Sequence, residues 1–369
     1  MKLLFVVQGE GRGHQTQAIS LWQQLQETEH EVVACLVGKA NEDDFSAYLG
    51  AELTCPVHYF QSPNLVYNAE GKGLSLSKTF TKNVSDIPKY WGSLNKMQGW
   101  IREYKPDLIL NFYDLLCGFY QMRFAATAPP MLCIGHQYLL LHNQFEFPEG
   151  RWFDRMLINM NSRLTAFGAK KLMALSFSPV MESKRVISVP PLIRKEVLNH
   201  ETGKYPYYLA YMTSPDLLVQ LKEWHKDHQH IEIHCFIQIN QDQEVVQYHK
   251  NLFVHKLNSA KFLKLMAHAR GLITTAGFES VCEAIYFGKP VMMVPVPNHY
   301  EQACNAKDAE NFGAGIAQKH FNLDEFMVYV EHHEEQSSRK FRDWLSAGKS
   351  RLLSEIERFD RSKTAEILS

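Results

Sequence analysis

Residues 272–315, LITTAGFESVCEAIYFGKPVMMVPVPNHYEQACNAKDAENFGAG, carry most of the information about the fold. A short apolar run is followed by a small-residue turn at 274–277, an amphipathic segment, a Gly-Lys-Pro turn and a second apolar run. Short apolar runs that alternate with helical patterns indicate parallel strands joined by helices. The turn at 274–277 therefore lies where a strand ends and a helix begins, which is where α/β proteins bind their ligands.

The polar residues of this stretch suit a nucleotide sugar. Its turn contains three small residues, Thr275, Ala276 and Gly277. Free backbone N–H groups at a helix start can bind a diphosphate without a metal. Glu283 lies two turns along that helix, where its carboxylate could accept both hydroxyls of a ribose, and Glu301 and Gln302 open the next helix, where they could bind sugar hydroxyls. Each residue alone is equally typical of a surface helix, but together they predict a donor site.

The same alternation extends over the whole chain. The chain begins with a predicted strand, KLLFVV, which is followed by a predicted helix, TQAISLWQQLQET, and a second strand, HEVVACLVG. Further parallel strands are predicted at KPDLILNF and PPMLCIGHQ. Prolines and polar residues interrupt the pattern at 189–206, and YYLAYM restarts it. We therefore expect an α/β protein with two doubly wound, Rossmann-like domains facing across a cleft. The predicted parts are an N-terminal domain over 1–190, a linker over 191–205, a C-terminal domain over 206–345 and a closing helix over 346–369.

The first predicted strand ends in a glycine-rich loop, QGEGRGHQTQ, at residues 8–17. A dinucleotide fingerprint needs G-x-G-x-x-G, but His14 or Thr16 stands where the last glycine should be, and LVGK ends the second strand without the expected acid. The loop instead predicts a turn that approaches a ligand closely and presents His14 at a helix start. A neutral imidazole there could act as a general base. Capping of the turn or packing in the cleft remains an alternative role for His14.

Composition narrows the class of protein. The chain has 369 residues, of which 45% are hydrophobic and 21% charged, and no apolar stretch is long enough to predict a membrane span. Its seven cysteines show no metal-site or disulfide spacing, which favours a cytoplasmic protein. A formal net charge of −1 argues against nucleic acid as the main partner.

Both ends of the predicted cleft resemble the GT-B glycosyltransferases. GEGRGHQTQA is similar to their N-terminal glycine loop with its histidine, and TAGFESVCEAIYFGKPVMMVP with EQACNA is similar to their donor-binding signature. The resemblance is to the nucleotide-sugar enzymes related to the macrolide and plant-type glycosyltransferases and to the peptidoglycan enzyme that adds N-acetylglucosamine to a lipid-linked precursor. It implies a GT-B fold whose C-terminal helix closes on the N-terminal domain.

The resemblance also assigns roles to residues. It places Gly11 and Gly13 on the acceptor-side loop and makes His14 the base. On the donor side it implies these contacts: Gly277 with the phosphates, Glu283 with the ribose, Glu301 and Gln302 with the donor sugar, Thr213 and Ser214 with the phosphates, and Leu257, through its backbone, with the nucleobase. Two departures stand out. Glu301 replaces the commoner aspartate, and Thr275-Ala276 replaces a serine or histidine before the glycine.

The implied reaction is an inverting transfer that needs no cofactor and no metal. His14 would deprotonate an acceptor hydroxyl, which attacks the anomeric carbon of a nucleotide sugar, a UDP-sugar in the first instance. Asp114, after a predicted strand, could orient His14 as the third group of a relay. His136 and Gln137, after the next strand, would face the same cleft and could contact acceptor or donor. All three are equally typical of polar residues at strand ends.

The acceptor is scarcely encoded, and two other functions stay open. Residues 71–105 mix seven basic residues with aromatic ones, a pattern that suits either an anionic bilayer carrying a lipid acceptor or a solvated helix pair with buried aromatics. A lipid or cell-envelope glycan precursor is therefore one candidate acceptor, and the inner-membrane surface one candidate location. The alternatives are a UDP-sugar 2-epimerase of the same architecture and a regulator that binds nucleotide sugars without catalysis.

Overall fold

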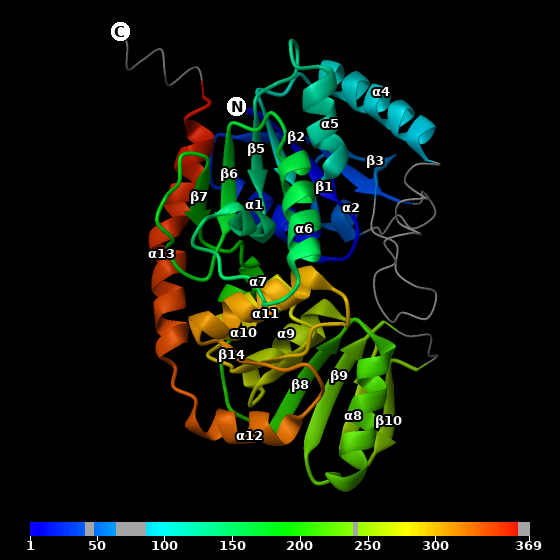
Figure 1. The fold of residues 1–369 in the computed structure, drawn as a ribbon, viewed down its shortest axis with the longest axis vertical. Coiled ribbons are helices and arrows are strands. Elements are labelled where there is room, and N and C mark those ends of the chain that lie inside the picture. Colours follow the sequence, from blue (N-terminus) through cyan, green and yellow to red (C-terminus); the bar gives the residue numbers. More distant parts are fainter. Residues whose placement is uncertain (41–47, 64–85, 239–242, 361–369) are drawn as a thin grey trace.

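The computed structural model describes residues 1–40, 48–63, 86–238 and 243–360. Two sheets, one from each half of the chain, lie one above the other in Figure 1. The strands of the first sheet are β1 (Lys2–Gln8), β2 (Glu31–Lys39), β3 (Val57–Gln61), β4 (Leu108–Phe112), β5 (Met131–Ile134), β6 (Lys171–Leu175) and β7 (Val186–Val189). The helices of this half and of the connection after it are α1 (Gly13–Leu25), α2 (Tyr48–Glu52), α4 (Ile87–Tyr104), α5 (Leu115–Arg123), η2 (His136–Leu141), α6 (Trp152–Thr165) and α7 (Lys195–Leu198).

The second half repeats this construction. Its strands are β8 (Tyr207–Met212), β9 (Glu232–Ile237), β10 (Val245–His249), β11 (Leu252–His255), β12 (Leu272–Thr274), β13 (Val291–Met293) and β14 (Gly315–Ala317). Its helices are α8 (Pro215–Asp227), α9 (Ser259–His268), α10 (Phe278–Tyr286), α11 (Tyr300–Phe312), α12 (Leu323–His332) and α13 (Gln336–Glu357). Within the described parts of the chain, no helix is long and apolar enough to cross a membrane.

Both sheets have the strand order of a doubly wound domain. The first runs β3-β2-β1-β4-β5-β6-β7 and is parallel throughout, and the second runs β10-β11-β9-β8-β12-β13-β14 with an antiparallel pair only at β10 and β11. The predicted α/β class is confirmed. Strand order reverses between β1 and β4 and again between β8 and β12, and ligands bind at such points. The loops that carry His14 and Gly277 follow β1 and β12, so both predicted site loops lie at switch points.

Packing on both faces of the first sheet explains why β1 is apolar from Leu3 to Val7. Leu3, Phe5 and Val7 of β1 pack into one buried cluster, while Leu4 and Val6 pack into a cluster on the other face of the sheet. A parallel strand covered by helices on both faces is apolar along its buried length, as LLFVV is at residues 3–7. The first cluster continues into the second half through apolar residues of β12, α10 and α13.

Helix α13 joins the two halves by crossing from the second to the first (Figure 1). Phe341 is buried in the shared cluster, the Trp344 indole donates to the backbone oxygen of Ser176 at 2.9 Å, and Gly348 lies against Pro190, where a Cβ would come within 2.6 Å of the proline ring. The expected closing helix is thus present, but it begins at Gln336 rather than near 346. The part of the prediction that covers residues 361–369 lies outside the described residues.

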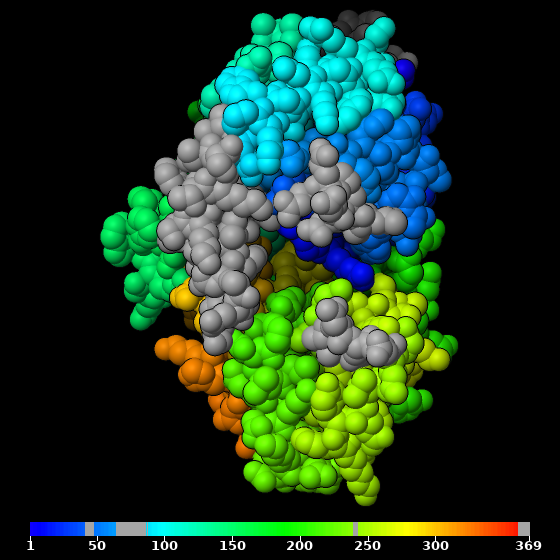
Figure 2. All heavy atoms as spheres, turned by 90° about the vertical axis from the view of Figure 1, so that its right-hand side faces the viewer, coloured from blue at the N-terminus to red at the C-terminus, as the bar shows by residue number. Residues whose placement is uncertain are grey.

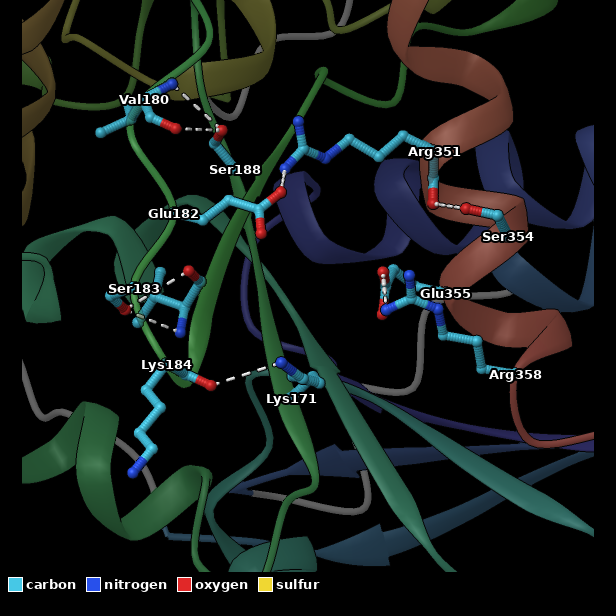
Figure 3. A network of polar contacts seen from close by, with 11 residues as sticks. Lys171, Val180, Glu182, Ser183, Lys184, Ser188, Arg351, Ser354, Glu355 and Arg358 are labelled. Carbon is cyan, nitrogen blue, oxygen red and sulfur yellow. Dashed lines mark hydrogen bonds and ion pairs between the residues drawn. The ribbon is translucent and has the colours of Figure 1, made fainter.

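Charged contacts hold the end of α13 to the first half. Arg351 donates to Glu182 in the loop between β6 and β7, as Figure 3 shows. The same loop is folded by the Ser188 hydroxyl, which binds the backbone nitrogen and oxygen of Val180, both at 3.1 Å. Helix α13 therefore begins beside the second half and ends against the first.

Candidate active site

A cavity of about 580 Å³ lies between the two switch points, and Figure 2 shows the surface hollowed between the two halves there. Its walls come from both domains. Predicted residues that line it on the N-terminal side are Gly11, Gly13, His14, His136 and Gln137. Predicted residues that line it on the other side are Thr213, Ser214, Leu257, Gly277, Glu283, Glu301 and Gln302. Residues far apart in the sequence are thus brought to one site.

The glycine loop makes close approaches that a side chain would block. A Cβ on Gly9 would come within 2.8 Å of the backbone oxygen of Gly38, and one on Gly13 would come within 2.8 Å of Glu279 Oε2 in the facing domain. Gly11 has a φ of +71°, the left-handed region that favours glycine. The Gln15 amide fixes the loop by donating to the backbone oxygens of Gly9 and Gly11 at 2.9 and 2.7 Å.

His14 lies in the first turn of α1 with both ring nitrogens beside glutamines. Nδ1 is 3.3 Å from Gln17 Oε1, and Nε2 is 3.3 Å from Gln137 Nε2. Its ring stacks on Tyr113, which has a φ of +63°, a strained conformation for a tyrosine. Burial lowers the pKa of His14, against the carboxylate of Glu301 and the Gln17 contact, which raise it. The imidazole is therefore neutral near pH 7, as a general base must be.

Each of the two glutamines is bound to a carboxylate of the facing domain. Gln17 donates to Glu279, and Gln137 donates to Glu301 Oε1 at 2.9 Å. Glu279 is half-buried, and desolvation raises its pKa to about 7. Sequence reasoning missed Gln17 and Glu279. Both lie within the two stretches that carry the resemblance, but no role was assigned to either, and their contact joins α1 to α10.

The structure does not show the predicted relay, because Asp114 makes no hydrogen bond to His14. Its carboxylate caps α5 by accepting the backbone N–H of Cys117 at 3.0 Å, and a Cβ on Gly38 would come within 2.2 Å of its other oxygen, so it points into the sheet edge at β2. Burial raises the pKa of Asp114 to about 6. Nδ1 of His14 faces Gln17 rather than Asp114.

His136 lines the cavity but serves the contact between domains. Its ring stacks on Phe278 of α10, with centroids 4.0 Å apart, and its Nδ1 is 2.8 Å from the backbone oxygen of Leu175. Burial lowers its pKa to about 4. Of the two residues expected after β5, Gln137 is the one that reaches His14.

The donor side is built from two helix starts. Gly277 and Ser214 precede α10 and α8 and line the cavity, and neither helix has a side-chain cap, so first-turn N–H groups are left without a side-chain acceptor there. The Thr213 and Thr275 hydroxyls lie 3.0 Å apart and join the two loops. Thr275 and Ala276 are buried behind the lining rather than in it, and it is Ala276, at φ +61°, that turns the chain.

Glu283 is buried and already has a cationic partner. Arg194, from the segment between the domains, donates to Glu283 Oε1 through Nε at 2.7 Å and lies within 2.6 Å through Nη2. Burial raises the pKa of Glu283, while Arg194 lowers it. Arg194 also donates to the Ser259 hydroxyl. Nothing in the sequence around Arg194 distinguished it from other linker residues.

The start of α11 fixes the remaining polar groups. Gln302 Oε1 accepts the backbone N–H of Val296 at 2.8 Å, which holds the preceding loop, so its amide nitrogen is left toward the cavity. Asn305 donates to the backbone oxygen of Ala276 at 3.1 Å and supports the strained turn. Glu301 is half-buried beside His14 and Gln137.

Aromatic side chains beside Leu257 line the far end of the cavity. Tyr211, Phe236 and Phe262 line the cavity as Leu257 does, and the ring centroids of Phe236 and Phe262 lie 5.4 Å apart in an edge contact. A flat apolar site of this kind suits a nucleobase. Within the described residues, no group of three His, Cys, Asp or Glu side chains could hold a metal ion.

Comparison with known proteins assigns the family. Residues 1–332 match Glycosyl transferase family 1. The chain belongs to this family. It is a glycosyltransferase, and the match spans both halves of the cavity. No curated protein matches the sequence.

Solved structures show that this family 1 glycosyltransferase has the GT-B fold. The glycotransferase of kitacinnamycin superimposes with a TM-score of 0.63 at 14% identity, over 97% of this chain and 98% of that one. UGT2 from Phytolacca americana, in complex with UDP-2fluoro-glucose and pterostilbene, has a TM-score of 0.63 at 12% identity, over 98% of this chain and 100% of that one. MurG from Acinetobacter baumannii has a TM-score of 0.58 at 15% identity, over 97% and 99%.

The basic and aromatic segment at 71–105 is described only from residue 86 onward, so Lys72, Lys78 and Lys82 lie outside the described residues. In the described part, Tyr90 and Trp100 pack against the core. Trp91 is 49% exposed, with the Arg123 guanidinium 4.3 Å from its ring. Contact with a membrane stays a prediction.

Proposed function

We propose that the protein transfers a sugar, with inversion, from a nucleotide sugar to an acceptor hydroxyl, and that His14 is the base. One observation carries this proposal: a buried, neutral imidazole and two uncapped helix starts face each other across one cavity. The acceptor hydroxyl gives its proton to His14 while its oxygen bonds to the anomeric carbon. The bond from that carbon to the diphosphate oxygen breaks, and the electron pair leaves with the nucleoside diphosphate.

The leaving diphosphate would be stabilised by the protein itself. N–H groups at the starts of α8 and α10 and the two helix dipoles favour negative charge there, which is why we propose that the reaction needs neither metal nor cofactor. Addition of EDTA should leave the rate unchanged, and a rate that EDTA abolishes and Mg²⁺ restores would contradict this part.

We propose a UDP-sugar as donor. Structures similar to this one include UGT2 from Phytolacca americana with UDP-2fluoro-glucose and the rhamnosyltransferase SpnG with thymidine diphosphate. The nucleobase of the donor must therefore be identified with a panel of nucleotides. Thermal shifts with UDP, dTDP and GDP would identify the nucleotide. Nucleotide release with each sugar would then be measured with hydroxyl acceptors, a lipid-linked glycan precursor among them.

Replacing His14 by alanine tests the base. The His14→Ala variant should bind nucleotide as the wild type does but release none with acceptor, whereas His332→Ala, on the exposed face of α12, should behave as the wild type. Full activity of His14→Ala would remove the imidazole from the reaction. If the donor is isomerised when no acceptor is present, the protein is the alternative UDP-sugar 2-epimerase. If the donor stays intact with every acceptor tested, the protein is a regulator that binds nucleotide sugars without catalysis.

A further inference from the structure

The two glutamines around His14 decide where its proton lies. A glutamine presents an oxygen that only accepts and an NH₂ group that only donates, so its orientation dictates the protonation of the ring nitrogen beside it. Gln17 approaches Nδ1 and Gln137 approaches Nε2. Both side chains are buried and line the cavity.

Glu279 orients Gln17. In the structure the NH₂ group of Gln17 donates to Glu279, which leaves its Oε1 facing His14. Because Oε1 can only accept, Nδ1 of His14 must carry the hydrogen. The 3.3 Å between Nδ1 and Oε1 is then an N–H···O contact.

Glu301 orients Gln137 in the same way. The Gln137 NH₂ group donates one hydrogen to Glu301 Oε1 at 2.9 Å, and its second hydrogen faces Nε2 of His14 at 3.3 Å. That contact requires a lone pair on Nε2. The two glutamines, which act on opposite sides of the ring, therefore specify the same tautomer.

We propose that Gln17 and Gln137 are positioning residues that hold His14 as the Nδ1–H tautomer, with an Nε2 lone pair that faces the Gln137 amide until the acceptor hydroxyl replaces it, and that the facing domain maintains this arrangement through Glu279 and Glu301. The inference rests on the proposed function, since it concerns the same base. When the acceptor proton reaches Nε2, the Nδ1–H bond stays directed at Gln17. The carboxylate of Glu279 then stabilises the imidazolium through the Gln17 amide.

This arrangement couples the base to the presence of both domains. Gln17 lies on α1 of the N-terminal domain, whereas Glu279 and Glu301 open α10 and α11 of the other. The Gln137 amide lies where the acceptor hydroxyl must approach Nε2. Its contact with Glu301 also places it where a donor sugar hydroxyl would bind, so entry of both substrates displaces one side chain.

Kinetics of paired variants test the role of Gln17. Gln17→Leu removes the acceptor for Nδ1–H and should lower kcat by about 10- to 100-fold, the range for a lost buried hydrogen bond, with little change in donor KM. Gln24→Leu, on the same helix but outside the cavity, should match the wild type. The double variant Gln17→Glu/Glu279→Gln exchanges carboxylate and amide and should recover most of the lost kcat.

The exchanged pair also predicts a pH shift. A carboxylate directly on Nδ1 favours the charged imidazole, so the acid limb of the kcat profile should move to higher pH in Gln17→Glu/Glu279→Gln. A role of Gln17 in packing alone would not move that limb. Failure of the exchanged pair to exceed the kcat of Gln17→Leu would overturn the inference.

Nitrogen NMR tests the tautomer without relying on activity. In the full-length protein labelled with ¹⁵N-histidine, long-range ¹H–¹⁵N correlations distinguish Nδ1–H from Nε2–H, and the His14 signal is the one absent from His14→Ala. We expect Nδ1–H in the wild type and a mixture in Gln17→Leu. An Nε2–H tautomer in an active wild type would overturn the inference alone. An Nδ1–H tautomer in a protein that transfers no sugar would support the positioning and refute the proposed function.

Discussion

Replacing Arg194 by alanine should destabilise the protein most at alkaline pH, because it removes the partner of a buried carboxylate. Arg194 and Glu283 lie 2.6 Å apart, with side chains only 12% and 4% exposed. Removing one member of a buried pair costs about 3 to 5 kcal/mol, since the other charge is left unpaired. We therefore expect Arg194→Ala to lower the free energy of unfolding at pH 8 by at least about 3 kcal/mol.

The sign of the pH dependence follows from the pKa of Glu283. Burial raises this pKa and Arg194 lowers it, so without Arg194 the folded-state pKa rises further above the unfolded value. Between these two values the folded state binds more protons, and stability falls as pH rises. The loss caused by Arg194→Ala should therefore be smaller at pH 5 than at pH 8.

Urea unfolding at both pH values measures this difference. The double variant Arg194→Ala/Glu283→Gln carries no unpaired charge, so its loss should be nearly the same at pH 5 and pH 8. Lys349→Ala breaks an exposed pair with Glu27 and should cost less than about 1 kcal/mol at either pH. An equal loss for Arg194→Ala at both pH values would refute the reasoning.

Three further predictions concern other parts of the structure. Asp114→Asn should keep the rate of nucleotide release within about twofold of the wild type, because Asn caps a helix as well as Asp. A much larger loss of rate would support the predicted role of Asp114 in orienting His14. Gly118→Ala places a Cβ 1.9 Å from the backbone oxygen of Leu164 and should lower the melting temperature. Gly99 lies in a helix, and a Cβ there would meet no atom within 4 Å, so Gly99→Ala should raise the free energy of unfolding by about 0.5–1 kcal/mol. Trp344→Phe loses a buried hydrogen bond and should cost about 1 kcal/mol in urea unfolding.

The architecture was predictable because it depends on local patterns. Apolar runs such as LLFVV and YYLAYM became central parallel strands, and the small-residue turn after LIT became the start of α10. Strand β10 was not predicted. It is an edge strand with half-buried or exposed residues, so the period of its apolar residues is weak.

Contacts that depend on three-dimensional packing were only partly predictable. His14 and Glu301 belonged to recognisable motifs, and the structure brings both to the cavity. Asp114 was predicted to orient His14, but it caps α5, because a carboxylate at a strand end can cap the next helix as readily as serve a site and spacing does not separate the two. Gln17 and Glu279 could not be paired, since their contact follows from how α1 packs against α10.

The path of α13 makes the N-terminal domain discontinuous in sequence. Its apolar surface is covered in part by Leu352 and Ile356, which follow every element of the other domain. A chimaera that exchanges donor domains at the 191–205 connection alone would carry a foreign final helix. That helix would have to match Ser176 and Glu182 of the native β6–β7 loop and Pro190 just after β7. Recombination of acceptor and donor specificities in this enzyme therefore needs two crossover points, the second of them before Phe341.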